Sequence, residues 1–217
     1  MAGLEEKLGR TLFWNVDTQH DFMRKNGKLY VPGAEEIESA LEKITVIARE
    51  YGIHVVSTAD SHQKGSKELS DKPDFKQTFP DHCMYGTEGA EFVPATKPRG
   101  GIYDVDWRTG TVNETLLLAQ RNTVLTKDDF DIFSKEHGSP HVDRVLELLK
   151  PERTFVYGVA TNVCVDFAVR GLVERGVEVY VVKDAIKGLP GIPEPTDKWV
   201  EMGVKLVESA TLEQYLR

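Results

Sequence analysis

The stretch at residues 155–165 constrains the fold of this chain more than any other feature of its sequence. Residues 154–159 form an apolar, β-branched and aromatic run, which is typical of a strand buried on both faces. Residues 163–175 then carry apolar side chains at helical spacing, and Gly176 is a natural helix stop. A buried strand that leads directly into a helix predicts an α/β unit, with Cys164 in the first turn of the helix.

The rest of the chain repeats this alternation of strands and helices. It predicts a three-layer α/β/α fold with a mostly parallel, six-stranded sheet. A length of 217 residues suits one hydrophobic core, so we expect a single domain over residues 1–217. The predicted strands are 12–17, 53–58, 122–126, 154–159, 177–182 and 204–207, and the predicted helices are 34–51, 140–149, 163–175 and 196–202.

Two segments break the alternation. Residues 61–98 are polar and rich in Lys, Asp, Pro and Gly, and structureless loops of this length are usually functional or disordered. We therefore treat 61–98 as a loop insertion in the fold. Residues 102–107 lie between Gly-Gly and Thr-Gly pairs, which predicts a small hairpin within residues 100–113.

Composition and charge limit the possible partners. The chain has 35 acidic and 27 basic residues, a formal charge of −8, which argues against nucleic acid or an anionic membrane surface as a partner. The first residues include Glu5 and Glu6, and no segment approaches the roughly 18 apolar residues of a membrane span. We therefore expect a cytoplasmic protein. Cys83 and Cys164 lack the spacing of a disulfide framework or metal site, so both should be free thiols.

Polar side chains follow the predicted strands at their carboxyl ends, where parallel α/β sheets bind ligands. Asp17 ends the first strand, Lys127 ends the third, and Cys164 follows the fourth. Alone, Asp17 and Lys127 are more often a helix cap and a solvated charge. Together they can accept the thiol proton and stabilise the thiolate, and the start of a helix favours an ionised thiol at Cys164. The alternative is that Cys164 is a small, buried core residue.

A second polar group lies at the end of the second strand. Asp60 and His62 are two residues apart, so in extended chain their side chains leave on the same face. His82 comes from the loop insertion. A carboxylate and two imidazoles suit zinc, iron or manganese, although a single histidine is more often a packed or solvated residue.

Five segments of the chain form a recognisable pattern. They are VDTQHDF at 16–22, TADSH at 58–62, FPDHCMYGTEGAEF at 79–92, KDDFDIF at 127–133 and GVATNVCV at 158–165. In this order and spacing the chain resembles the isochorismatase-like cysteine hydrolases, and within them the nicotinamidase branch. The resemblance extends from residue 12 to about residue 212.

The resemblance implies an amidohydrolase that converts nicotinamide to nicotinate and ammonia through a cysteine thioester. Its catalytic residues would be Asp17, Lys127 and Cys164. It further implies a cis peptide bond between Val159 and Ala160, with the backbone N–H groups of Ala160 and Cys164 forming the oxyanion hole.

The resemblance also implies one divalent metal ion bound by Asp60, His62 and His82. Zinc is the leading candidate, and iron or manganese are alternatives. Some family members have a fourth protein ligand upstream of the last histidine, and here the candidates are Asp74 and Glu68.

For the substrate, the resemblance implies contacts from Gln19, Phe22 and Phe79, with the two aromatic rings on either side of a pyridine ring. Two residues depart from the common pattern: His20 replaces an Asn, and Phe79 replaces the Trp of many nicotinamidases. Relatives are often homo-oligomers, so self-association is expected as well.

Other functions remain open at this point. A metal-free cysteine hydrolase of the same superfamily, acting on a carbamoyl or ureido substrate, is disfavoured by the Asp and His residues. Isochorismatase activity is disfavoured by Cys164, since cleavage of a vinyl ether does not use this thiol in the family. A non-catalytic scaffold would be expected to lack at least one of Asp17, Lys127 and Cys164.

Overall fold

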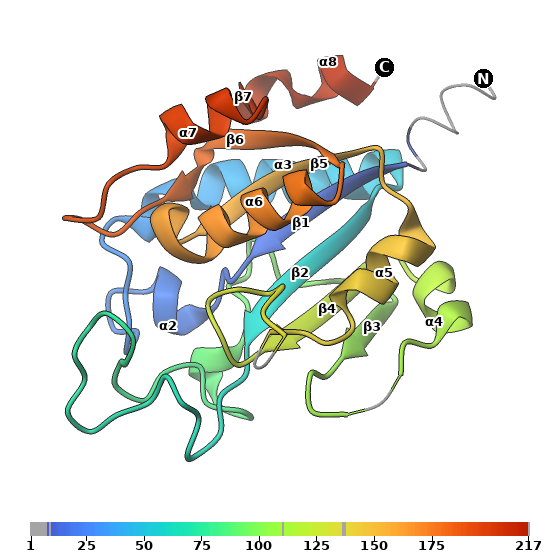
Figure 1. The fold of residues 1–217 in the computed structure, drawn as a ribbon. Helices are drawn as coiled ribbons and strands as arrows, with labels where there is room; N and C mark the ends of the chain where they lie inside the picture. The colour runs from blue at the N-terminus through green and yellow to red at the C-terminus, as the bar shows by residue number, and fades with distance from the viewer. Residues whose placement is uncertain (1–7, 9, 110, 136–137, 217) are drawn as a thin grey trace.

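The computed structural model describes residues 8, 10–109, 111–135 and 138–216. Its strands are β1 (Thr11–Val16), β2 (His54–Asp60), β3 (Ile102–Val105), β4 (Asn122–Lys127), β5 (Arg153–Val159), β6 (Glu178–Lys187) and β7 (Lys205–Val207). They form one sheet in the order β3-β4-β2-β1-β5-β6-β7, and every ladder between them is parallel (Figure 1). The predicted α/β/α architecture is confirmed, with seven strands where the sequence predicted six.

The additional strand is β3, and it corrects the predicted hairpin. Residues 102–105 pair in parallel with β4 at the edge of the sheet and do not fold back on a neighbouring segment. Along this strand Ile102 is exposed and Val105 is buried, an alternation that suits an edge strand as well as a hairpin arm. The sequence pattern of residues 102–107 therefore predicted an extended segment correctly but did not predict that it pairs with β4. Gly110, within the predicted hairpin, lies outside the described residues.

Helices cover both faces of the sheet. Figure 1 shows α6 in front of the sheet and α3 behind it. The α-helices are α2 (His20–Met23), α3 (Glu38–Tyr51), α4 (Glu114–Ala119), α5 (Val142–Leu149), α6 (Asp166–Glu174), α7 (Thr196–Glu201) and α8 (Leu212–Leu216). The 3₁₀ turns are η1 (Ala34–Ile37), η2 (Glu88–Ala90) and η4 (Ser209–Thr211), and η3 (Thr161–Val165) is a π-helical turn. None of the described helices is long and apolar enough to cross a membrane.

The core divides into two layers because side chains alternate along each strand. Phe13 and Phe155 pack with Leu41 of α3 on one face of the sheet. Trp14 and Val156, their neighbours in sequence, pack with α5 and α6 on the other. Burial of each such side chain contributes about 1.5–3 kcal/mol. The strands are thus covered on both sides, as their continuous apolar runs predicted.

The topology creates a switch point at the middle of the sheet. From β1 the chain moves outward to β2 and β4, then returns to place β5 on the other side of β1. Ligands bind at such points beyond the carboxyl ends of the strands. Gly158 allows β5 to approach β1 closely: its φ is +121°, and a Cβ there would lie 2.1 Å from the carbonyl oxygen of Val16. The residues after β1 and β5 therefore become neighbours.

Residues 61–98 contain the short turn η2 as their one helical element among the described residues. Isolated bridges pair His62 with Met84 and Leu69 with Phe79, which fold the segment back on itself. The predicted loop insertion therefore covers the carboxyl end of β2, next to the switch point.

His54, at the start of β2, makes stability sensitive to acid. It is buried, and its Nε2 lies 2.8 Å from the Thr123 hydroxyl. Burial, with a smaller effect of Arg121, lowers the pKa of His54 to about 4. An unfolded histidine binds its proton near pH 6.5, so between these values the unfolded chain holds more protons. We expect His54 to reduce the free energy of unfolding by up to about 3 kcal/mol as the pH falls through this window.

Urea denaturation at several pH values checks this expectation. The variant His54→Gln should lose less stability than the wild-type protein between neutral pH and about pH 4.5. The variant His141→Gln replaces a less buried histidine and serves as the control, so its stability should depend on pH as that of the wild-type protein does. An equal pH dependence in His54→Gln and wild type would contradict the assignment.

Candidate active site

Lys127, the last residue of β4, lies at the centre of the site. It is 1% exposed, and its Nζ lies 2.9 Å from Asp17 Oδ2 and 3.9 Å from Cys164 Sγ. It also forms an ion pair with Asp60. The structure therefore brings the three predicted catalytic side chains together and connects them to a fourth polar residue.

The parallel sheet sets these positions. In the ladder between β2 and β4, Asp60 is the direct partner of Lys127. Asp17 follows β1 with a φ of +47°, and its backbone N–H donates to the carbonyl oxygen of Thr58. The Thr58 hydroxyl donates to Asp17 Oδ1 at 2.6 Å, which orients the carboxylate. Adjacent strand ends thus hold the acid and the ammonium side by side.

Cys164 lies in the π-helical turn η3, between β5 and α6. The N–H groups of Val163 and Val165 both donate to the carbonyl oxygen of Ala160, at 3.0 and 3.1 Å, and the Cys164 N–H does not join them. The peptide bond between Val159 and Ala160 is cis, as the resemblance implied. The predicted helix at 163–175 thus begins as a wider turn that presents the thiol beyond the strand.

Burial changes the acid–base chemistry of the site. It raises the pKa of the Cys164 thiol well above the usual range, although Lys127 acts against this rise. It also raises the pKa of Asp17, again opposed by Lys127. Burial would lower the pKa of Lys127, but Asp17 and Asp60 outweigh it, so the pKa is raised and the group stays cationic. The expectation of a readily ionised thiol was wrong, and Cys164 needs a base.

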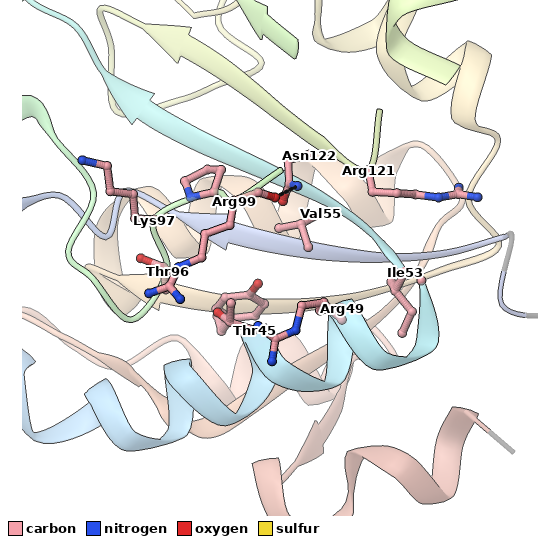
Figure 2. Close-up of a pocket in the computed structure, with 13 residues that line it drawn as sticks. Thr45, Arg49, Ile53, Val55, Thr96, Lys97, Arg99, Arg121 and Asn122 are labelled. Atoms are coloured by element: carbon pink, nitrogen blue, oxygen red, sulfur yellow. Dashed lines mark hydrogen bonds between the residues drawn. The ribbon is translucent and has the colours of Figure 1, made fainter. Parts of the chain in front are cut away.

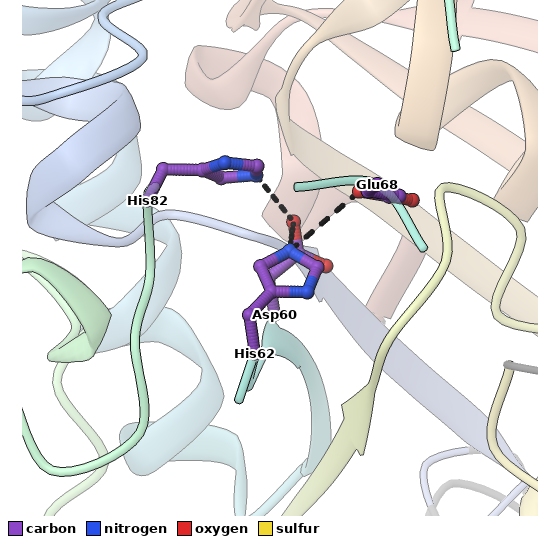
Figure 3. A group of neighbouring side chains, drawn as sticks. All are labelled: Asp60, His62, Glu68 and His82. Carbon is purple, nitrogen blue, oxygen red and sulfur yellow. Dashed lines mark ion pairs between the residues drawn. The ribbon is translucent and has the colours of Figure 1, made fainter. Parts of the chain in front are cut away.

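Four side chains form a candidate metal site beside Lys127 (Figure 3). Their potential ligand atoms all lie within 4.8 Å of one another, and all four residues are buried. Three of them, Asp60, His62 and His82, are the predicted ligands, and Glu68 is the fourth. Asp60 comes from the end of β2, and the others come from the loop insertion.

The second candidate for the fourth ligand, Asp74, lies elsewhere. Its side chain is exposed, and Oδ1 accepts hydrogen bonds from the backbone N–H groups of residues 76–78 at 2.8–2.9 Å. These hydrogen bonds hold the pKa of Asp74 well below its usual range. Asp74 therefore stabilises a turn of its own loop, and the structure favours Glu68.

The four-residue group fits a divalent cation. Both carboxylate oxygens of Glu68 and the Nε2 of His62 are buried without a hydrogen bond from any described residue. Burial, with the nearby charge of Asp60, raises the pKa of Glu68 to about 8. Buried polar atoms normally have partners, and a metal ion would supply one to all three. Two carboxylates and two imidazoles suit zinc, manganese or iron.

A further carboxylate orients one of these imidazoles. Asp128 Oδ1 lies 2.6 Å from His62 Nδ1 and accepts a second hydrogen bond from the Ser66 hydroxyl. Similarly, His82 Nδ1 lies 2.9 Å from the Pro80 carbonyl oxygen. Such contacts fix a histidine with its other nitrogen toward the metal. The sequence did not reveal Asp128, because a carboxylate just after a strand is usually a surface residue.

An apolar cavity of about 560 Å³ opens onto both groups. It is lined by Cys164, Asp60 and His82 and by five phenylalanines, which are Phe22, Phe75, Phe79, Phe130 and Phe167. The ring centroids of Phe22 and Phe79 lie 5.5 and 6.2 Å from that of His82. The predicted Phe22 and Phe79 thus face the cavity, which suits a flat, apolar substrate.

Gln19 has a different place from the one predicted. Its side-chain amide donates to the carbonyl oxygens of Asp60 and Ala90, and its side-chain oxygen accepts from the Asp60 N–H, each at 2.8 Å. It is fully buried and does not line the cavity. Gln19 therefore positions the backbone of Asp60 and has no contact with the cavity in which a substrate would bind.

The sequence is similar to known proteins of one family. The isochorismatase domain family matches residues 104–194. The nicotinamidase/pyrazinamidase of Mycobacterium tuberculosis is 28% identical over 80% of this chain and 84% of its own length. The nicotinamidase of Acinetobacter baylyi is 25% identical, with 91% and 92% covered.

Solved structures share the fold. The pyrazinamidase of Pyrococcus horikoshii in complex with zinc superimposes with a TM-score of 0.72, at 23% identity, over 92% of this chain and 99% of its own. The N-carbamoylsarcosine amidase of Thermoplasma acidophilum gives 0.70, at 20% identity, over 92% and 96%. Fold and sequence relatives thus make this chain similar to the isochorismatase-like hydrolases. The curated relatives that it matches, at 23–28% identity, are nicotinamidases.

The two cysteines should react differently with an alkylating agent. Cys164 lines the large cavity and has Lys127 beside it to stabilise a thiolate. Cys83 is fully buried and does not line this cavity. Limiting iodoacetamide followed by peptide mass spectrometry should show modification of Cys164 first. Earlier labelling of Cys83 would contradict this site geometry.

Removing the carboxylate of Asp128 should weaken metal binding. Without it His62 loses the partner that fixes its ring, so Asp128→Ala should lower zinc affinity by about 10- to 100-fold. Competition with a chromophoric chelator measures this affinity without relying on turnover. Asp71→Ala, which removes an exposed carboxylate from the loop insertion that contains His62, is the control. Equal affinities in the two variants would show that Asp128 does not position His62.

Proposed function

We propose that this protein is an amidohydrolase that converts nicotinamide to nicotinate and ammonia through a thioester on Cys164. One observation carries the proposal: Lys127 contacts Asp17 and Cys164 on one side and Asp60 of the candidate metal site on the other. The proposed nucleophile and the candidate metal site, which would bind the substrate ring, therefore line the same aromatic cavity. Sequence relatives named as nicotinamidases support the same substrate.

The first half of the reaction forms the thioester. Asp17 accepts the proton of the Cys164 thiol, and the sulfur attacks the amide carbon of nicotinamide. The carbonyl oxygen becomes an oxyanion, and the N–H groups of Ala160 and Cys164 are the proposed donors that stabilise it. When the intermediate collapses, the carbon–nitrogen bond breaks and Asp17 returns the proton to the leaving ammonia.

The second half releases the acid. Asp17 accepts a proton from a water molecule, whose oxygen attacks the thioester carbon. The carbon–sulfur bond then breaks, the proton returns to Cys164, and nicotinic acid leaves and ionises to nicotinate in solution. Burial raises the pKa of Asp17, which makes its carboxylate a stronger base for both proton transfers.

Lys127 acts as the fixed positive charge of the cycle. Its ammonium lies near the Cys164 sulfur and the Asp17 carboxylate, so it stabilises the thiolate while the proton is held on Asp17. Since Asp17 and Asp60 keep its pKa high, Lys127 does not itself release a proton.

We propose zinc at Asp60, His62, Glu68 and His82. When bound there, the ion supplies a Lewis-acid position that can accept the pyridine nitrogen. Phe22 and Phe79 line the same cavity. Together with the metal they would orient the pyridine ring of the substrate with its carboxamide toward Cys164. The metal site would therefore select substrates with a ring nitrogen.

Ammonia release from nicotinamide by the purified protein tests the proposal. Cys164→Ser and Asp17→Asn should each lower kcat by about 10²–10⁴-fold, because one loses the nucleophile and the other the base. Cys83→Ala, which replaces the cysteine outside the cavity, should retain turnover. Full activity in Asp17→Asn would remove the basis for the proposed base.

Benzamide separates this function from the metal-free alternative. It has the same ring and carboxamide but no ring nitrogen, so its kcat/KM should be far below that of nicotinamide. Removing the metal with a chelator should abolish this preference while Cys164 still reacts with iodoacetamide. Full turnover of nicotinamide without metal, or hydrolysis of a carbamoyl substrate instead, would favour the metal-free class.

A further inference from the structure

A second cavity lies at the amino ends of the strands, whereas Cys164 lies beyond their carboxyl ends. Its volume is about 180 Å³, and it is lined by the first residues of β2 and β4 and by the last turn of α3 (Figure 2). Since the strands are parallel, these amino ends lie opposite the carboxyl ends that carry the candidate active site. The two cavities share no lining residue.

This cavity is strongly cationic. Arg49, Lys97, Arg99 and Arg121 line it, and no carboxylate does. Lys97 is paired with Glu91 at 2.8 Å, whereas the three arginines form no ion pair with any residue that the structure describes. In Figure 2 the side chains of Arg49 and Arg99 run toward Thr45 and Thr96, and those of Lys97 and Arg121 extend outward. Arg49 and Arg99 are therefore available to an anion.

A buried hydroxyl group also lines the cavity. Tyr157 of β5 is 1% exposed, and its hydroxyl makes no hydrogen bond within the described parts of the chain. Burial alone raises its pKa well above the usual range, so the group keeps its proton. A ligand in the cavity could accept a hydrogen bond from it.

The remaining lining of the cavity is apolar. Ala48, Ile53, Val55 and Pro98 contribute to it together with the Tyr157 ring. A volume of 180 Å³ equals about six water molecules at roughly 30 Å³ each, which limits the occupant to a small molecule. An inorganic anion would satisfy the arginines but leave the apolar wall without contact. A ring that carries one carboxylate would satisfy both.

We propose that this cavity binds a small aromatic carboxylate. Arg49 and Arg99 bind the carboxylate, Tyr157 donates its hydroxyl hydrogen to an oxygen of the ligand, and the ring packs on Ile53 and Val55. Guanidinium groups suit this role because they pair with carboxylates through two parallel hydrogen bonds. None of these residues takes part in the proposed hydrolysis, so an experiment can disprove ligand binding in this cavity without disproving the hydrolysis, and the reverse.

Isothermal titration calorimetry with benzoate tests the proposal on the full-length protein. Benzoate lacks the ring nitrogen expected at the metal site, so it reports on the cationic cavity. The double variant Arg49→Gln/Arg99→Gln should weaken benzoate binding by at least about tenfold, and Tyr157→Phe should weaken it several-fold. Arg144→Gln, at an exposed arginine of α5, should bind like the wild-type protein.

Two further ligands define the class. Benzamide, which has the same ring without the charge, should bind much more weakly than benzoate, and so should inorganic phosphate. The proposal is overturned if wild-type protein binds no benzoate at millimolar concentration, or if the double variant binds it unchanged. Equal binding of phosphate and benzoate would also overturn it, since the apolar wall would then play no part.

Discussion

The structure of this site depends on one buried cation. Lys127 is held in the interior between the carboxylates of Asp17 and Asp60. Burying a charge costs several kcal/mol unless partners compensate for it, and removal of one partner from a buried pair typically costs about 3–5 kcal/mol. The three groups therefore exist as a unit. Because Asp60 is also a candidate metal ligand, the same ion pairs that stabilise Lys127 connect the nucleophile to the site that would anchor a substrate.

The sheet makes this unit possible. Asp60 and Lys127 are direct partners in neighbouring parallel strands, and Asp17 follows the strand on the other side of β2. Cys164 reaches the group from β5, across the switch point. The loop insertion then supplies three of the four candidate metal ligands from outside the sheet. Rigid strand ends thus set the catalytic geometry, while a loop adds the chemistry that would distinguish one substrate from another.

Sequence reasoning identified the groups that follow strand periodicity. The α/β/α class and the positions of Asp17, Lys127 and Cys164 came from apolar runs and from the polar residues that end them. It failed where tertiary contacts decide. Both Glu68 and Asp74 are acids in a long loop, and only folding shows that one is buried with two imidazoles and the other caps a turn. The raised pKa of Cys164 likewise comes from burial, which the start of a helix does not reveal.

The central claim is that Cys164 becomes acylated beside a metal-anchored ring. Rapid acid quench during turnover of nicotinamide, followed by mass spectrometry of the peptide that contains residue 164, tests it most directly. The account predicts a nicotinoyl adduct on Cys164 that appears before steady state and disappears when substrate is exhausted. Steady release of ammonia with no adduct on Cys164, or with an adduct on another residue, would contradict it.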